Sequence, residues 1–325
     1  MNESKIQPDN LGRRGFGMQH QLTNQQLSEL RNTSVFIGAN DEQIKRIMNM
    51  MGPNYSWPAS DSKKQAKRGI LVLSHGLGVE GDRALRERIQ KSDIGLPVVL
   101  AFGMSMITSE HIKMALDELL VAGVQEIVVI PVLSTHKNSL MRQWQYIFGE
   151  REDPEYTTVD RVSSPMDIIL TDALDDHPIV GSIVASHARE ASIKPMEEQV
   201  IIVGHGPVGF EDNLQQLSIM ENIANFVRAD RSYYAVHVAS LQDDAPREVR
   251  TANLQKIRDV IQNGYSKNLK TIIVTNLLGS RIVQSSLRKG LSGLEYRFNS
   301  KGLIANDLFI NWIEESANNG SQHIE

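Results

Sequence analysis

The feature that most constrains this chain is a pattern that it carries twice. An apolar run at 69–73 ends in Ser-His-Gly, and an apolar run at 200–203 ends in Gly-His-Gly. The two histidines are His75 and His205. A short apolar run that ends in a glycine turn is typical of a buried strand entering a loop. The sequence therefore predicts two copies of one α/β domain.

A second apolar run follows each of these histidines. The run at 126–131 continues to His136, and the run at 271–275 continues to Arg281. The first copy thus has two histidines at matched strand ends, whereas the second copy has one histidine and an arginine. Paired histidines can hold a metal ion, and arginine cannot. We therefore expect the first copy to be the active one.

Length and composition limit the possible functions. A chain of 325 residues has room for two domains. It contains no cysteine, which excludes disulfides, thiolate metal sites and cysteine-bound iron–sulfur clusters. A formal charge of −5 gives no support to nucleic-acid binding. We find no apolar run long enough for a membrane span and no secretion signal at the N-terminus, so we expect a cytoplasmic protein.

Three segments are predicted along the chain. Residues 1–68 form a polar leader and linker, mostly helical or irregular, and residues 69–195 and 196–325 form the two domains. In the leader, helices are expected at 24–30 and 41–48, with Thr23 and Asn40 as N-caps.

Within each repeat, predicted strands alternate with predicted helices. Strands are expected at 70–74, 97–102, 127–131 and 157–162, and at 200–204, 234–239, 271–275 and 294–298. Helices are expected at 82–92, 108–122, 137–148 and 176–191, and at 212–228, 246–263, 280–289 and 302–317. Strands that are apolar on both faces predict a doubly wound parallel sheet, which binds ligands at the carboxyl ends of its strands.

His75 and His136 are the candidate catalytic residues and metal ligands. Both follow strands of one predicted sheet, so their side chains can converge at the same edge. Neutral imidazoles suit Fe²⁺, Co²⁺, Ni²⁺ or Zn²⁺. Because two ligands leave coordination positions open, the pair suits a site that metal enters and leaves better than a closed structural site.

Residues 69–149 resemble the sirohydrochlorin cobaltochelatases and ferrochelatases, the class II tetrapyrrole chelatases. The resemblance rests on features that follow one another in the same order as in the family: the His-Gly turn, a strand at 98–102, a helix at 112–120, a strand at 127–133 and a second histidine. Residues 196–317 resemble the same domain more weakly. The chain is thus similar to a tandem, two-domain form of this family.

The resemblance implies a lyase that inserts Co²⁺ or Fe²⁺ into sirohydrochlorin or a related tetrapyrrole, as in siroheme and cobalamin biosynthesis. The metal would be a substrate, and neither a nucleotide nor an iron–sulfur cluster is implied. His75 and His136 match the two family histidines, which bind the metal and accept the pyrrole protons. Histidine can take a proton near neutral pH.

The remaining candidates concern the substrate. Arg281 and His205 are predicted to bind the carboxylate-rich macrocycle, and Met104 to lie over its face. Met104 lies where the family often has an acidic residue. His111 and His237 are weaker candidates, interpreted mainly as structural histidines.

Two other functions compete with the chelatase hypothesis. The first is a chelatase-like carrier that binds a tetrapyrrole or metal without turnover. The second is a nucleotide-binding protein, suggested by the glycines at 76–81 but opposed by the lack of an acidic residue at the end of the second strand. The sequence leaves open the metal, the tetrapyrrole, the oligomeric state and the role of the leader.

Overall fold

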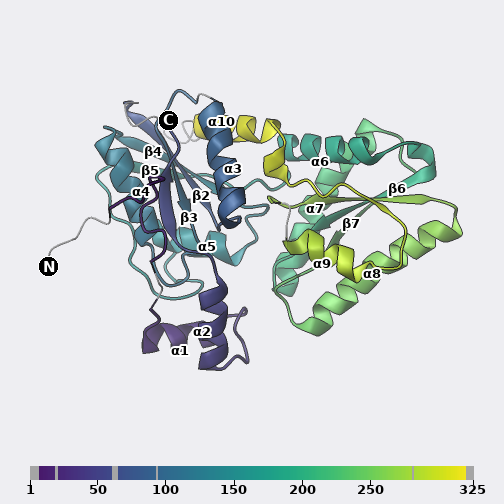
Figure 1. Cartoon of the computed structure of the whole chain (residues 1–325), viewed down its shortest axis with the longest axis horizontal. Coiled ribbons are helices and arrows are strands. Elements are labelled where there is room, and N and C mark those ends of the chain that lie inside the picture. Colours follow the sequence, from purple (N-terminus) through teal and green to yellow (C-terminus); the bar gives the residue numbers. More distant parts are fainter. Residues whose placement is uncertain (1–6, 19–20, 61–64, 93, 280–281, 320–325) are drawn as a thin grey trace. The chain divides into compact units, whose positions relative to one another are not determined.

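The computed structural model describes residues 7–18, 21–60, 65–92, 94–279 and 282–319, and it has two compact α/β units (Figure 1). The first unit comprises Met1–Leu133, Asn138–Ala173 and Ile313–Glu325. The second comprises Ser134–Lys137 and Leu174–Trp312. Each unit has its own sheet, as the repeated sequence pattern predicts.

The sheet of the first unit has the order β1-β3-β2-β4-β5. Its strands are β1 (Tyr55–Pro58), β2 (Arg68–Ser74), β3 (Val98–Phe102), β4 (Glu126–Val132) and β5 (Asp167–Leu170). Strands β2 to β5 pair in parallel, and β1 pairs antiparallel with β3. In this register Ser74 lies opposite both Phe102 and Val132, so the central strands end together.

The central strands of this sheet are buried on both faces. Alternate residues such as Leu71 and Val129 pack into a core with helices α4 (Glu110–Val121) and α5 (Ser139–Ile147). The intervening residues, such as Ile70, are equally buried on the other face, and α3 (Gly78–Lys91) follows β2. Two-sided burial explains why these strands read as continuous apolar runs.

The leader is part of the first unit. Its helices α1 (Asn24–Arg31) and α2 (Asp41–Met50) begin with capping boxes on Thr23 and Asn40, as predicted. The mostly helical or irregular leader also contains one strand that was not predicted, since residues 55–58 form the edge strand β1. A run of four residues that ends in proline gives little strand signal, and proline is tolerated at an edge.

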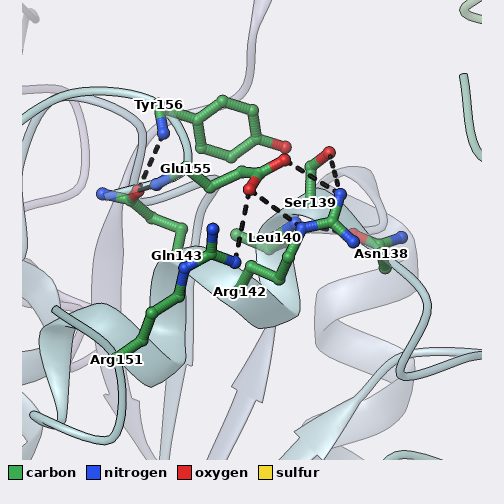
Figure 2. A network of polar contacts seen from close by, with 8 residues as sticks. All are labelled: Asn138, Ser139, Leu140, Arg142, Gln143, Arg151, Glu155 and Tyr156. Atoms are coloured by element: carbon green, nitrogen blue, oxygen red, sulfur yellow. Dashed lines mark hydrogen bonds and ion pairs between the residues drawn. The ribbon is translucent and has the colours of Figure 1, made fainter. Parts of the chain in front are cut away.

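The predicted strand at 157–162 is wrong, since the edge strand is β5 ten residues further on. Figure 2 shows how α5 holds the residues just before the predicted range. The side-chain oxygen of Gln143 on α5 accepts hydrogen bonds from the backbone N–H groups of Glu155 and Tyr156, and Arg142 binds the Glu155 carboxylate through two nitrogens, at 2.8 and 2.9 Å. Within the range itself, the backbone N–H of Thr158 donates to the Glu29 carboxylate and that of Val162 to a carbonyl oxygen of α5, so these donors do not pair with a strand.

The sheet of the second unit has the order β7-β6-β8-β9 and is parallel throughout. Its strands are β6 (Glu198–Gly204), β7 (Ala235–Ser240), β8 (Lys270–Asn276) and β9 (Arg297–Phe298). Helices α8 (Arg247–Ser266) and α9 (Ile282–Gly290) contribute to the core on one face. The helix predicted at 302–317 is shorter, with a 3₁₀ turn at Leu303–Ala305 and then α10 (Leu308–Asn319).

The units do not follow the repeat boundary along the chain. Helix α6 (Pro178–Ala191) comes from the first repeat, yet it belongs to the second unit. It packs against α7 (Phe210–Asp230) so closely that a β-carbon on Gly181 would lie 2.3 Å from the Phe226 ring. The end of α10, from Ile313 on, belongs to the first unit. Each unit therefore includes a helical segment that the other repeat supplies.

Candidate functional site

His75 lies in the loop that joins β2 to α3. Ser74 before it is fully buried at the end of the strand, and His75 itself is half-buried. The next glycine, Gly76, has φ +90°, and a β-carbon there would meet nothing within 4 Å outside its chain neighbours. The loop thus leaves the backbone beside His75 accessible at close range.

A buried carboxylate anchors this loop. Asp82, in the first turns of α3, accepts hydrogen bonds from the backbone N–H of Leu77 at 2.6 Å and from the Tyr55 hydroxyl at 2.8 Å. Burial raises the pKa of Asp82 in spite of these two hydrogen bonds, and burial together with the Asp82 charge raises the pKa of Tyr55. The leader strand β1 is thereby tied to the loop that carries His75.

His136 lies in the loop after β4, where Asp175 binds it twice. The backbone N–H of His136 donates to Oδ1 of Asp175 at 3.0 Å, and Nδ1 of the ring lies 2.9 Å from Oδ2. The His136 side chain is 41% exposed and that of Asp175 only 15%. Among the residues that the structure describes, Asp175 is the hydrogen-bond partner found for this ring, so Nε2 is the nitrogen directed to other ligands.

Asp175 is a site residue that the sequence analysis missed. The acidic pair at 175–176 reads as the start of a helix, because negative charge is favourable there. In the structure the N-cap of α6 is His177, and Asp176 accepts a hydrogen bond from Asn222. No local pattern connects Asp175 to a loop 39 positions earlier, so its role becomes visible only in the fold.

Asp82 and Tyr55 are also missing from the sequence-based site. Asp82 follows His75 by seven positions and lies where an acidic residue of a helix start is common. That spacing could have drawn attention to it. Tyr55 could not have been found, because its strand was not predicted.

His205 lies in the corresponding loop of the second unit, after β6. Its Nδ1 is 3.1 Å from the carbonyl oxygen of Gly206, and its Nε2 is 3.5 Å from the Asp244 carboxylate. A β-carbon on Gly206 would lie 2.8 Å from the backbone nitrogen of Gln242. This loop is therefore packed against the loop after β7, and a carboxylate faces the outer nitrogen of the histidine.

The other predicted residues have different places. Met104 packs, partly buried, against the hydrophobic core of the first unit. His111 is buried, and its Nε2 lies 3.1 Å from the Ser105 hydroxyl. His237 is a half-buried residue in the middle of β7, where burial and the charge of Arg228 lower its pKa. Arg281 lies outside the described residues.

Two further observations bear on ligands. In the described part of the chain, no group of three or more His, Asp or Glu side chains is arranged to hold a metal ion. A cavity of about 470 Å³ lies at the amino ends of β6 and β8, lined among others by Glu198, Lys270 and Arg297. It is at the opposite edge of the second sheet from His205, so it is separate from the histidine loops.

None of the helices within the described ranges has the length and apolar character needed to cross a membrane.

The chain was compared with known proteins. No protein-family model matches the sequence, and no curated protein matches it. The fold is similar to that of SirB from Bacillus subtilis, solved with Fe³⁺, with a TM-score of 0.58 and 17% identity, over 80% of this chain and 99% of SirB. DR2241 from Deinococcus radiodurans, described as similar to chelatases with two additional domains, gives a TM-score of 0.47 and 13% identity, over 78% of this chain and 55% of that protein. The chain thus has the two-domain chelatase-like α/β fold that the resemblance of its first repeat predicts.

Proposed function

We propose that this protein is a chelatase that inserts a divalent metal, Co²⁺ or Fe²⁺, into sirohydrochlorin or a related tetrapyrrole. The observation that carries the proposal is the placement of two histidines after neighbouring parallel strands. Ser74 and Val132 are paired in the register of β2 and β4, His75 directly follows the first, and His136 comes four residues after the second. The Fe³⁺ in the similar SirB structure adds support.

The chemistry of the two imidazoles fits metal insertion. The ring must lose two N–H protons when the metal enters, and a neutral histidine near pH 7 can accept a proton or hold a borderline metal. A site with few protein ligands releases the metal to the macrocycle more easily than a closed site. His75 and His136 are the residues that we assign to metal binding and proton transfer.

Substrate binding is assigned mainly to residues of the second repeat. Arg281 is proposed to pair with the carboxylates of the macrocycle, because a guanidinium stays charged and binds carboxylates in a fixed geometry. His205 of the second repeat and Met104 of the first are the other residues proposed to bind substrate. In this view the second repeat has kept the fold and lost the metal chemistry.

A carrier function is the second candidate. The observation that favours it is the stretch after β3, where the family often has an acidic residue. Here Ser105 is buried and accepts a hydrogen bond from the Trp144 indole N–H at 3.0 Å, so this stretch serves the core. A carrier would bind the tetrapyrrole or metal without releasing a product.

The test is an anaerobic absorbance assay with sirohydrochlorin and Co²⁺ or Fe²⁺. We expect multiple turnovers with the wild-type protein. His75→Ala and His136→Ala should each lower kcat/KM about 10²-fold or more, the size typical of a lost acid–base residue. His205→Ala is the comparison variant: because His205 is assigned to substrate binding and not to metal or proton transfer, we expect a higher KM for the tetrapyrrole and a kcat within a few-fold of the wild type.

Other outcomes decide against the proposal. A spectral change that saturates at one equivalent, without turnover, would identify a carrier. Absence of any spectral change would reject sirohydrochlorin as the ligand. Equal losses in His75→Ala and His205→Ala would reject the assignment of catalysis to the first repeat.

A further inference from the structure

The contact between Asp175 and His136 is more specific than a single ion pair. One carboxylate accepts the backbone N–H through Oδ1 and faces ring nitrogen Nδ1 with Oδ2, at 3.0 and 2.9 Å. The backbone N–H can only donate, so Oδ1 is committed to it. Because a carboxylate accepts hydrogen bonds, the group opposite Oδ2 must be an Nδ1–H. The geometry therefore selects one of the two neutral tautomers of His136.

The backbone on both sides of this contact is held in a defined conformation. Asp175 has φ +43°, a left-handed conformation that aspartate tolerates better than most residues but that still has a cost. The next two residues are also held, since Asp176 accepts a hydrogen bond from Asn222 at 2.6 Å and His177 caps α6. A strained residue persists where its surroundings determine its conformation.

We propose that Asp175 is a positioning residue that holds His136 as the Nδ1–H tautomer, so that Nε2 presents its lone pair to an incoming divalent metal. The inference deepens the proposed chelatase function and rests on it for the destination of the metal. Metal-binding histidines commonly donate their second ring N–H to a carboxylate, which fixes the tautomer and the ring orientation.

His205 shows that the arrangement is not a general property of this fold. Its Nδ1 lies 3.1 Å from a carbonyl oxygen of its own loop, and the Asp244 carboxylate is 3.5 Å from Nε2. In His205 the carboxylate therefore faces Nε2, whereas in His136 Nε2 is the nitrogen left for ligands. Asp244 is also the more exposed of the two carboxylates, at 67% against 15% for Asp175.

Asp175→Asn is the decisive variant. Asparagine has nearly the same volume and tolerates the left-handed conformation. Its single carbonyl oxygen must still accept the backbone N–H of His136, which turns its NH₂ group toward Nδ1. An NH₂ group donates, so it favours the tautomer with the proton on Nε2, and that nitrogen then has no lone pair for a metal. Replacing one carboxylate oxygen by an NH₂ group should therefore move the ring proton of His136 from Nδ1 to Nε2.

The measurement is a long-range ¹H–¹⁵N spectrum of the imidazole rings in full-length protein with ¹⁵N-labelled histidine. It is recorded at about pH 8.5, above the usual pKa range of histidine. His136→Gln identifies the signal. We expect Nδ1–H in the wild type and Nε2–H in Asp175→Asn. Titration with Co²⁺ alone should show affinity about 10- to 100-fold weaker in Asp175→Asn than in the wild type.

Asp176→Asn is the matched control, because it makes the same chemical change at the next residue, which contacts Asn222 instead of His136. It should leave both the tautomer and the Co²⁺ affinity unchanged. A wild-type His136 with its proton on Nε2 would overturn the inference without any variant. So would an Asp175→Asn protein that keeps the Nδ1–H tautomer and the wild-type Co²⁺ affinity.

The outcome is separable from that of the proposed function. A wild-type protein that has the Nδ1–H tautomer and binds Co²⁺ through His136, yet never metallates a tetrapyrrole, would support the inference and reject the chelatase proposal. A protein that turns over with His136 in the other tautomer would support the chelatase and reject the role of Asp175.

Discussion

The loop after β2 and the loop after β6 carry the same His-Gly pair but hold it differently. In the first, the space beside Gly76 is open, and the Asp82 carboxylate anchors the loop by accepting a hydrogen bond from the Leu77 N–H. In the second, Gly206 packs against the loop after β7, and Gln242 donates hydrogen bonds to the carbonyl oxygens of Pro207 and Val208. The same short motif thus serves an accessible loop in one unit and a packed loop in the other.

The difference supports assigning the chemistry to the first repeat. A histidine can work on a bulky, flat substrate only if neighbouring atoms leave room for it. Gly76, after His75, leaves that room. Gly206, after His205, is packed so closely against Gln242 that a side chain there would collide with it.

Replacing each glycine by alanine is the strongest test of this comparison. Both have positive φ, at +90° for Gly76 and +83° for Gly206, which costs alanine about 1–2 kcal/mol. In Gly206→Ala the new methyl group also overlaps Gln242, which adds about 1–3 kcal/mol. We expect Gly206→Ala to lower the free energy of unfolding by about 2–5 kcal/mol in total, and Gly76→Ala by only the roughly 1–2 kcal/mol that positive φ costs. Urea unfolding of both variants measures it, and equal losses would show that the two loops are equally packed.

The anchor of the first loop gives the next largest effect. Tyr55→Phe removes one of the two donors to buried Asp82, so we expect a loss of about 1–3 kcal/mol in the free energy of unfolding, the range for an unsatisfied buried acceptor. Hydrogen exchange at the Leu77 amide should also become faster, because that amide donates to the same carboxylate. Tyr265→Phe is the control, since the Tyr265 hydroxyl donates to a carbonyl oxygen at an exposed position. If both variants lose the same stability, Asp82 and Tyr55 are not a special anchor.

Acidification is expected to lower the stability of the second unit more than that of the first. This effect should be smaller than those of the substitutions above. His187 lies on α6, and burial lowers the pKa of its ring below the ordinary 6.5. The charge of Glu190 raises this pKa and the charge of Lys301 lowers it. A lowered histidine pKa means that the unfolded chain binds protons more readily than the folded one. Stability of the second unit should therefore fall as the pH drops below about 6.5. In the first unit the pKa of Asp82 is raised, so its protonation does not favour unfolding.

Hydrogen–deuterium exchange measured peptide by peptide between neutral pH and about pH 5 checks this, after correction for intrinsic exchange rates. Peptides of the second unit should lose protection first. His187→Gln, which removes the titrating ring, should make the difference smaller. A first unit that opens before the second would contradict the expected sign.

Much of the fold could be predicted because buried parallel strands are apolar on both faces. The runs that became β2, β4, β6 and β8 stand out for that reason, and helix caps such as Thr23 have a local signature. Short edge strands lack such a signature. Tyr55–Pro58 was missed, and the segment expected to be a strand at 157–162 instead donates backbone N–H groups to the Glu29 carboxylate and to a carbonyl oxygen of α5.

The candidate site divides in the same way. His75 and His136 could be found because the ends of apolar strands can be read directly from the sequence. The residues that hold the loops of these histidines could not, because Tyr55, which binds Asp82, and Asp175, which binds His136, come from distant segments whose approach depends on the fold. Contacts of that kind depend on loop conformation, such as the left-handed backbone of Asp175, which no local pattern specifies.

The helices that belong to the opposite unit have a consequence for synthesis on the ribosome. When the first repeat has emerged, α6 is already made, but β8 and α7 of its own unit are not. The first unit in turn includes the chain from Ile313 on, so it is completed only after most of the second repeat has been translated. A nascent chain stalled at the repeat boundary would therefore contain neither unit whole.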